Sequence, residues 1–445
     1  MHRAAHTALS VAIALVAFAP SARAQEPPRT KDVKEAEKFM ASAMTAQDTA
    51  ERRSRFERAL NPLRIAATKD PSNARVWVAM GQAYAGLHDA VHADSAFRKA
   101  QELYPGFADE INNLRLGGWA DAFNAGVALM DAQKYEEAIV VLQGAELFNS
   151  TRPESKMNLG ALYANKGDAA QAEQHFRAAW AITEGPEKAK LKPEDAANWT
   201  RYAALAKLSV AQMVAQRGVE GFEAQKYDDA IKYFKEAHEL NPVARDYTYN
   251  LAQSLYAKAT PMEQRRQKLA DEEKAARARK DASTAKAKAD EAAAISKELL
   301  DMYAQVEPLT VAAREMDPMN EDLFLLQARS YRIRGDLVSD AATRSTYMSR
   351  VNDLLTLHDA MPVEVTGIAV GPGTPESTVK GQVKNRKLKA GDPVKVHFTL
   401  LGMDGASIGE QDIMITAPAV GQTAPFEVKV KTSGDVAGWK YAIGQ

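Results

Sequence analysis

The 445-residue sequence contains no cysteine, so disulfide bonds and thiolate metal sites are both excluded. It also lacks an excess of either charge, because 57 Lys and Arg stand against 58 Asp and Glu, a formal net charge of −1. A near-neutral chain lacks the excess of positive charge that is typical of nucleic-acid-binding proteins. Since 46% of the residues are hydrophobic, an apolar core can hold the fold without disulfides.

The common catalytic motifs are missing as well. There is no Walker loop, no G-x-S-x-G elbow, no H-E-x-x-H and no G-x-G-x-x-G that opens a helix after a strand. His88 and His92 are spaced i, i+4, which could place two imidazoles on one metal ion, but two ligands without a third are insufficient. We predict a non-enzymatic protein without a cofactor, and keep as an alternative a metal-binding protein or enzyme that uses His88 and His92.

Residues 1–24 have the three parts of a secretory signal peptide. Arg3 gives a positive start, residues 8–19 form an apolar run, and Ala22-Arg23-Ala24 provides a small-residue cleavage site. The apolar run is shorter than the roughly 20 residues that a membrane-spanning helix needs. We expect cleavage after Ala24, a periplasmic or secreted protein, and no integral membrane segment in the mature chain.

A pattern of small and large apolar residues recurs through residues 30–361, a segment rich in helix-forming residues. With Ala74 counted as position 1, positions 4, 7, 8, 11, 20, 24, 27 and 32 hold Trp77, Met80, Gly81, Tyr84, Ala93, Phe97, Ala100 and Pro105. Further copies start at Trp119, Pro153, Ala211 and Arg245; Pro153 follows Trp119 by 34 residues, and Arg245 follows Ala211 by 34. The offsets place each set on one face of a helix.

This pattern resembles the tetratricopeptide repeat over about residues 40–345, because eight offsets agree at once. The resemblance implies two helices per repeat, which approach closely where small residues such as Gly81 and Ala93 stand. It predicts an α-solenoid of helix-turn-helix repeats over residues 30–361, with about seven units. A generic helical bundle with coincidental alanines is the alternative, and the 34-residue spacing argues against it.

Three insertions interrupt the frame, of about 11, 24 and 42 residues. The longest, about residues 261–302, is rich in Ala, Lys and Glu. Because the second helix of a repeat returns beside the first, we predict a protruding helical hairpin that turns near Asp281-Ala282-Ser283. Each arm of about 20 residues would project about 30 Å. We interpret it as a solvated, partly frayed arm; the alternative is a dedicated docking arm.

Residues 363–445 form a separate segment in which apolar and polar residues alternate, as in Val394, Val396 and Phe398. This period of two predicts half-buried strands, and Asp404-Gly405 marks a hairpin turn. About seven strands would form a small all-β sandwich. The order of its motifs resembles the immunoglobulin-like FxLYD-type domains of bacterial exported proteins, although the literal FxLYD string is absent.

The resemblance to tetratricopeptide repeats also implies a concave groove, lined by positions 2, 5, 6, 9, 12 and 13 of each first helix. Position 6 holds an amide in four copies: Asn124, Asn158, Gln216 and Asn250. This row resembles the asparagine ladder of O-linked N-acetylglucosamine transferases, in which such residues hold substrate peptides. Apolar and aromatic residues would form a floor for an apolar or amphipathic segment: Phe123, Met157, Phe222, Tyr249 and Tyr256.

The predicted function is therefore that of an exported scaffold that binds an extended or helical segment of a protein or peptide partner in this groove. A structural spacer of the cell envelope, acting through the helical arm and the β domain, is the second hypothesis. The sequence predicts neither the partner nor an oligomeric state.

Overall fold

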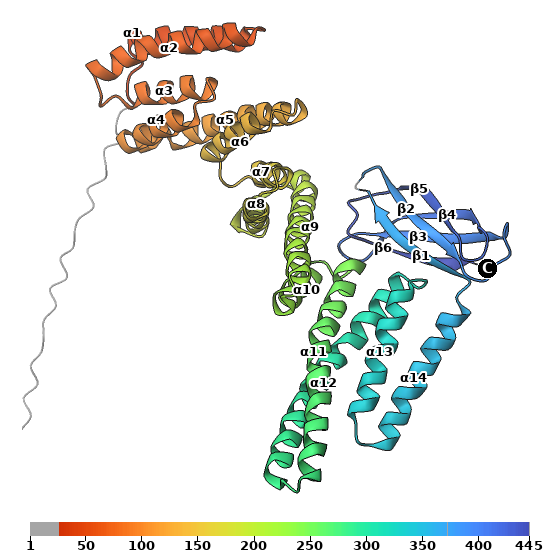
Figure 1. The fold of residues 1–445 in the computed structure, drawn as a ribbon. Helices are drawn as coiled ribbons and strands as arrows, with labels where there is room; N and C mark the ends of the chain where they lie inside the picture. The colour runs from red at the N-terminus through yellow and green to blue at the C-terminus, as the bar shows by residue number, and fades with distance from the viewer. Residues whose placement is uncertain (1–25, 372, 445) are drawn as a thin grey trace, which may run out of the picture. The chain divides into compact units, whose positions relative to one another are not determined.

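A computed structural model describes residues 26–371 and 373–444, so the predicted signal peptide, residues 1–24, lies outside the described residues. The chain divides into two compact units, residues up to 155 (unit 1) and from 156 onward (unit 2). Figure 1 shows helices through both units and a β domain at the C-terminal end. The predicted combination of a helical-repeat fold and a small β domain is confirmed.

Unit 1 consists of three helical hairpins followed by the first residues of a fourth. Its elements are α1 (Lys31–Thr45), α2 (Thr49–Lys69), α3 (Ala74–Gly86), α4 (Ala90–Leu103), the short 3-10 helix Pro105–Phe107, α5 (Ala108–Asp131) and α6 (Tyr135–Phe148). The 11-residue insertion lengthens α5 at its N-terminal end, where Ile111 is fully buried.

Unit 2 contains the remaining helices. They are α7 (Pro153–Asn165), which begins at the unit boundary, α8 (Ala169–Thr183), the 3-10 helix Pro186–Lys190, α9 (Pro193–Glu223), α10 (Tyr227–Leu240), α11 (Arg245–Ala278), α12 (Ala282–Met316), α13 (Glu321–Leu337) and α14 (Ala341–Ala360). The 24-residue insertion lengthens α9, and Trp199 anchors the extension because its indole N–H donates a 2.9 Å hydrogen bond to the carbonyl of Thr183.

The repeat pattern corresponds to one recurring contact between the two helices of a hairpin. A Cβ added to the position-8 glycine would lie under 3 Å from the position-24 side chain in four hairpins: Gly81 on Phe97, Gly126 on Leu142, Gly160 on Phe176 and Gly218 on Phe234. The position-20 alanines opposite them are fully buried: Ala93, Ala138, Ala172 and Ala230. Only small residues allow this helix-to-helix distance, which is why the sequence repeats them.

The turn inside each hairpin is also repeated. Position 15 adopts a left-handed conformation in His88 (φ 58°), Gln133 (59°), Gly167 (78°) and Gln225 (58°). The next backbone N–H then bonds the carbonyl five residues back, as from Asp89 to Tyr84 at 3.0 Å. This is a helix C-terminal cap of the Schellman type. The position of His88 in the turn is therefore structural.

The 42-residue insertion lengthens both helices of one repeat, α11 and α12, as predicted. Its turn lies at Arg279–Asp281, slightly earlier than expected, and reuses the repeat turn: Lys280 has φ 61°, and the Asp281 N–H bonds the Ala276 carbonyl at 3.0 Å. Buried residues join the two helices along their length: Leu269, Ala276, Ala285, Leu299 and Tyr303. This apolar seam runs nearly to the tip, so the arm is not purely polar; partial fraying stays a prediction.

The β domain has six strands in the described residues, one fewer than the approximate number predicted. They are β1 (Val363–Val370), β2 (Glu376–Asn385), β3 (Pro393–Leu401), β4 (Ser407–Thr416), β5 (Thr423–Lys431) and β6 (Gly438–Gly444). Two antiparallel sheets, ordered β1-β2-β5 and β4-β3-β6, enclose a core that includes Val383, Val396, Phe398 and Val430. The alternation of residues along each strand supplies this core.

One end of the β domain packs on the helices of unit 2. The Asn241 side chain donates a 2.8 Å hydrogen bond to the Ala437 carbonyl, and the Val365 N–H bonds the Met319 carbonyl at 3.1 Å. Arg201 in α9 makes a bidentate ion pair with Asp435, at 2.9 and 3.0 Å. The domain is thus fixed to α9 and to the connections that join α10 to α11 and α12 to α13.

Candidate partner-binding groove

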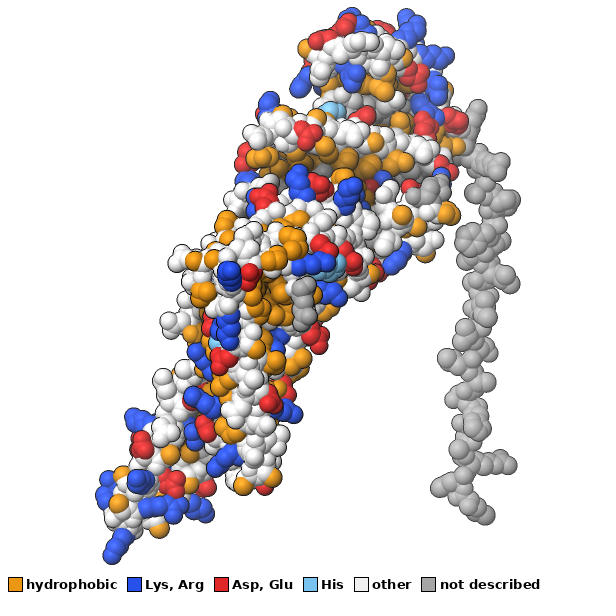
Figure 2. Space-filling model, turned by 90° about the vertical axis from the view of Figure 1, so that its right-hand side faces the viewer, with side chains coloured by type: hydrophobic (Ala, Val, Ile, Leu, Met, Phe, Trp, Pro, Cys, Tyr) orange, Lys and Arg blue, Asp and Glu red, His pale blue; other side chains and the backbone are white. Residues whose placement is uncertain are grey.

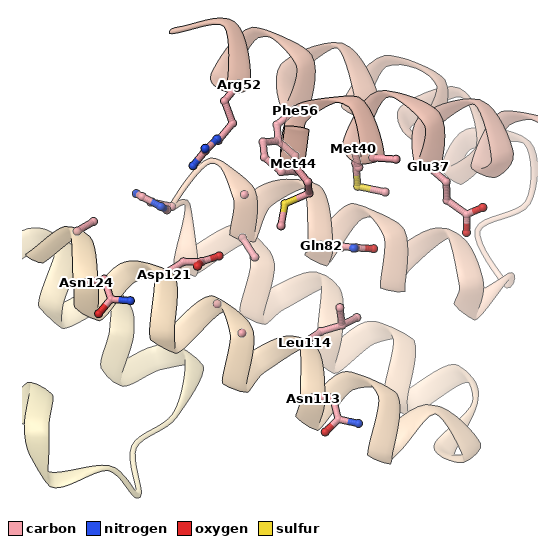
Figure 3. Close-up of a pocket in the computed structure, with 17 residues that line it drawn as sticks. Glu37, Met40, Met44, Arg52, Phe56, Gln82, Asn113, Leu114, Asp121 and Asn124 are labelled. Carbon is pink, nitrogen blue, oxygen red and sulfur yellow. The ribbon is translucent and has the colours of Figure 1, made fainter. Parts of the chain in front are cut away.

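A cavity of about 680 Å³ lies among the first helices of unit 1. Its walls come from α1, α3 and α5, with the start of α2 above them, as Figure 3 shows. These are the helices that the repeat pattern assigns to the concave side. The cavity lies entirely within residues 37–125.

The α1 side of the cavity carries two methionines beside the carboxylate of Glu37. Met40 and Phe56 are buried beneath it, whereas Met44 is 69% exposed and its thioether points into the space between the helices (Figure 3). Leu114 faces it from α5 and is half-buried. An exposed methionine is flexible and polarizable, so it can adapt to apolar partners of different shape.

Amide side chains line the other walls. Gln82 in α3 and Asn113 and Asn124 in α5 are all exposed. Within residues 26–371 and 373–444, none of these side chains makes a hydrogen bond to another protein group. Each amide offers donors and an acceptor at once, so the three can pair with the backbone of a polypeptide whatever its side chains.

Charged groups of both signs enter the cavity from opposite walls (Figure 3). Arg52 is tethered because its guanidinium donates a 3.0 Å hydrogen bond to the Ala46 carbonyl at the end of α1. Asp121 projects from α5 toward the same space. Desolvation lowers the pKa of His88 and Arg52 adds to this effect, while the carboxylate of Asp121 opposes it.

The floor of the cavity includes exposed helix backbone at Gly117. A Cβ built on Gly117 has no atom within 4 Å, whereas one built on the adjacent Gly118 would lie 3.0 Å from the ring of Phe148. Gly118 is therefore a packing glycine. Gly117 leaves open space above α5, and a larger side chain there would enter the cavity without displacing the core.

The predicted groove residues divide between the two units. Asn124 lines the cavity of unit 1, while Phe123 beside it is half-buried and stacks on Trp119, with ring centroids 5.3 Å apart. Asn158, Gln216 and Asn250 lie in α7, α9 and α11 of unit 2. In the described chain their amides also lack a hydrogen bond to the protein, so their predicted role stays a prediction.

The predicted aromatic floor is partly gathered in unit 2. Phe222 and Tyr256 line a second cavity of about 410 Å³ together with Tyr227 and Gln253. Met157 and Tyr249 pack partly against the core of unit 2. Burial raises the pKa of Tyr249, with a smaller contribution from Asp322 and an opposing one from Arg245, whose guanidinium lies 4.8 Å from the ring centroid.

Sequence reasoning missed several residues of the unit 1 cavity. Gln82, Ala85 and Gly86 occupy positions 9, 12 and 13, which the repeat assigns to the concave side, so a search beyond position 6 would have found them. Met44 and Asn113 carried no such signal. They lie in the least regular repeat copy and in the 11-residue insertion.

The alternative metal site at His88 and His92 lacks a third ligand. Across the described residues, no group of three or more His, Asp or Glu side chains is placed to hold a metal ion. His92 instead bonds Asp89 through Nδ1 at 2.7 Å and stacks on Tyr84, with centroids 5.1 Å apart. Among the same residues, none of the helices has the length and apolar character needed to cross a bilayer.

Comparison with known proteins yields structural neighbours alone. No family model matches the sequence, and no curated protein matches it. The chain is similar to the solved TPR domain of P58(IPK), with 10% identity over 74% of this chain and 100% of that one and a TM-score of 0.24. YrrB, titled a TPR protein with an unusual peptide-binding site, has 14% identity over 52% and 91% and a TM-score of 0.20. Yeast Tom70 has 14% identity over 72% and 64%, also at 0.20.

At these TM-scores the neighbours support no conclusion about activity or partner. The repeat is instead supported by the geometry inside the chain, namely the glycine-to-aromatic contact and the left-handed turn residue that recur from hairpin to hairpin.

Proposed function

We propose that the protein is an exported, non-enzymatic scaffold that holds a segment of a partner polypeptide in the groove of unit 1. The observation that carries the proposal is the composition of the cavity: the exposed thioether of Met44 on one side, unengaged amides on the others, and open space above Gly117. Apolar side chains of an amphipathic segment can pack against the Met44 thioether, and the backbone of the segment can hydrogen-bond to the amides.

Unit 2 carries three further predicted amides. Asn158, Gln216 and Asn250 would each offer donors and an acceptor to the backbone of a partner segment that lies on unit 2. Phe222 and Tyr256, with Gln253, would take an apolar side chain in the second cavity. Export rests on the sequence of residues 1–24.

Photo-crosslinking from the groove tests the proposal. A benzophenone amino acid at Gln82 faces the cavity, and the matched control is Ser95, which is exposed on α4, the second helix of the same hairpin. After irradiation in cells, mass spectrometry identifies the captured chain. We expect a defined partner peptide from Gln82 and none from Ser95. Equal capture from both positions would contradict the proposal.

The spacer hypothesis needs a different test from domain deletion. Removal of residues 363–445 would uncover Met319 and leave the buried carboxylate of Asp317 without Tyr441, so loss of function in that variant would be ambiguous. Surface substitutions in the groove separate the two hypotheses without this damage.

A further inference from the structure

The free end of the α11–α12 hairpin carries a dense positive charge. Residues 274–288 contain six Lys or Arg and one Asp, whereas the whole chain has a net charge of −1. Figure 2 shows blue side chains gathered at this end, the lowest coloured part of the view. The only acidic residue of the stretch, Asp281, is occupied, because it caps α12 by accepting a 3.0 Å hydrogen bond from the Thr284 N–H.

Four of these cations form no ion pair or hydrogen bond with an acidic side chain in the described chain, although, after the hydrogen bonds from Thr284, the charge of Arg279 helps to lower the pKa of the Asp281 carboxyl. They are Lys274, Arg279, Lys280 and Lys286, and all four side chains belong to exposed residues. Nearer the body of the hairpin the charges are paired, for example Lys288 with Glu272 at 2.8 Å and Arg265 with Glu291 at 2.7 Å. Within the stretch itself Arg277 pairs with Glu273 at 2.6 Å, so the unpaired cations of this stretch, within the described chain, are the four named above.

The register of the hairpin brings like charges to the same level. Because Lys288 pairs with Glu272, the antiparallel helices place Lys286 opposite Lys274. A helix dipole stabilises cations at the C-terminal end of α11, which accounts for Arg279 and Lys280. It disfavours a cation near the N-terminal end of α12, where Lys286 stands. Helix stability alone does not explain the set.

We propose that this tip binds the anionic phospholipid headgroups of a bilayer surface. The tip is convex, and its apolar residues are alanines, so it lacks the large aromatic or aliphatic anchors that hold a protein partner. A flat surface with many equivalent negative charges requires neither a pocket nor an anchor. The helices from Pro261 to Ala278 extend about 27 Å, which carries these charges away from the repeat core.

Vesicle co-sedimentation tests the proposal with the full chain. We expect binding to vesicles of phosphatidylcholine with phosphatidylglycerol at about 50 mM salt, and release at about 500 mM, where exposed charges are screened within a few ångströms. The tip variant replaces Lys274, Arg279, Lys280 and Lys286 with Gln, which keeps helix propensity. At about fivefold per cation, its partition coefficient should fall by two orders of magnitude or more.

A matched control replaces four exposed, unpaired lysines elsewhere: Lys34, Lys38, Lys235 and Lys297. It has the same net charge as the tip variant and the same N-terminus, so any contribution of residues 1–24 cancels. The control should bind nearly as the unmodified chain does. The proposal would be overturned if vesicle binding fell equally in both variants, or if the unmodified chain did not bind anionic vesicles at low salt. Binding to polyglutamate in place of vesicles would also overturn it.

Discussion

The hydroxyl of Tyr441 in β6 lies 2.7 Å from the carboxylate of Asp317 at the end of α12, two residues 124 positions apart in the sequence. Asp317 is 2% exposed and also binds the guanidinium of Arg245 at 2.8 Å and the Asn320 amide at 2.9 Å. The same hydroxyl accepts a 3.0 Å hydrogen bond from the Met319 N–H. This buried polar cluster is one of the contacts that fix the β domain on the helices.

Tyr441→Phe should therefore loosen the β domain. The change leaves the Met319 N–H without its acceptor and the carboxylate with one donor fewer, a loss of about 1–3 kcal/mol. Hydrogen–deuterium exchange should rise in β6 and at the end of α12, and the unfolding midpoint should fall. Tyr135→Phe, at an exposed position of α6, is the control. If the hydrogen–deuterium exchange of the Tyr441 variant were the same as that of the Tyr135 variant, this account would be contradicted.

Replacement by alanine should change the free energy of unfolding in opposite directions at Gly160 and at Gly117. At Gly160 the new Cβ would lie 2.6 Å from the ring of Phe176, so Gly160→Ala should destabilise by up to about 2 kcal/mol after the gain in helix propensity is counted. At Gly117 nothing lies within 4 Å, so Gly117→Ala should stabilise by about 1 kcal/mol. Urea unfolding of both variants measures this. The same sign for both would contradict the assignment of Gly160 to packing and Gly117 to the groove floor.

Glu307 should make the last repeats sensitive to acid. It accepts 2.8 Å hydrogen bonds from Tyr331 and Arg350 and pairs with Arg334, which joins α12, α13 and α14. Burial would raise the pKa of Glu307, but the hydrogen bonds from Tyr331 and Arg334 and the nearby positive charges outweigh it and lower the pKa below the ordinary 4.5. A depressed carboxyl pKa stabilises the fold above the unfolded-state pKa, and this contribution disappears as the pH falls through the folded-state pKa.

Glu307→Gln tests this pH dependence. The unfolding free energy of the unmodified chain should exceed that of the variant at pH 7, and the difference should shrink as the pH falls below about 4.5. Glu298→Gln, at an exposed and unpaired position of α12, should show little difference at any pH. If the difference in unfolding free energy between the unmodified chain and Glu307→Gln stayed constant from pH 7 to pH 3, the stabilising role of the Glu307 ion pairs would be contradicted.

The N-terminus of the exported protein should begin at Gln25. Ala22-Arg23-Ala24 offers small residues at the cleavage site, and Glu26, the first described residue, already pairs with Arg75 of α3. Sequencing of the N-terminus of protein isolated from the envelope or medium measures this. Recovery there of a chain that retains Met1 or the apolar run would contradict export through a cleaved signal.

The sequence predicts the repeats well because each hairpin is specified by local contacts. Gly81 and Phe97, or Gly126 and Leu142, are 16 residues apart and meet in the same hairpin, so a fixed spacing reports their packing. The α11–α12 arm follows from the same logic, since its turn at Lys280 is the ordinary repeat turn displaced along two longer helices.

Contacts between residues far apart in the sequence were harder to predict. Nothing local connects Tyr441 to Asp317, or Arg201 to Asp435 across 234 residues, so the docked β domain could not be predicted from pattern. Of the residues that line the unit 1 cavity, the sequence-based prediction of the groove named Asn124. Met44 and Asn113 enter the cavity from irregular segments, where the repeat gives no position number.

The most direct test of the central claim is how tightly groove variants bind the partner that is captured through Gln82. Gly117→Leu places a larger side chain in the cavity without disturbing the core. The combined Asn124→Ala, Asn158→Ala and Asn250→Ala removes one amide from the cavity and two from unit 2, at about 0.5–1.5 kcal/mol each. Calorimetric titration should show affinity at least tenfold weaker for Gly117→Leu and one to three orders of magnitude weaker for the triple variant, with no fall in thermal stability in either. Unchanged affinity in both variants would contradict the claim that the partner lies in this groove.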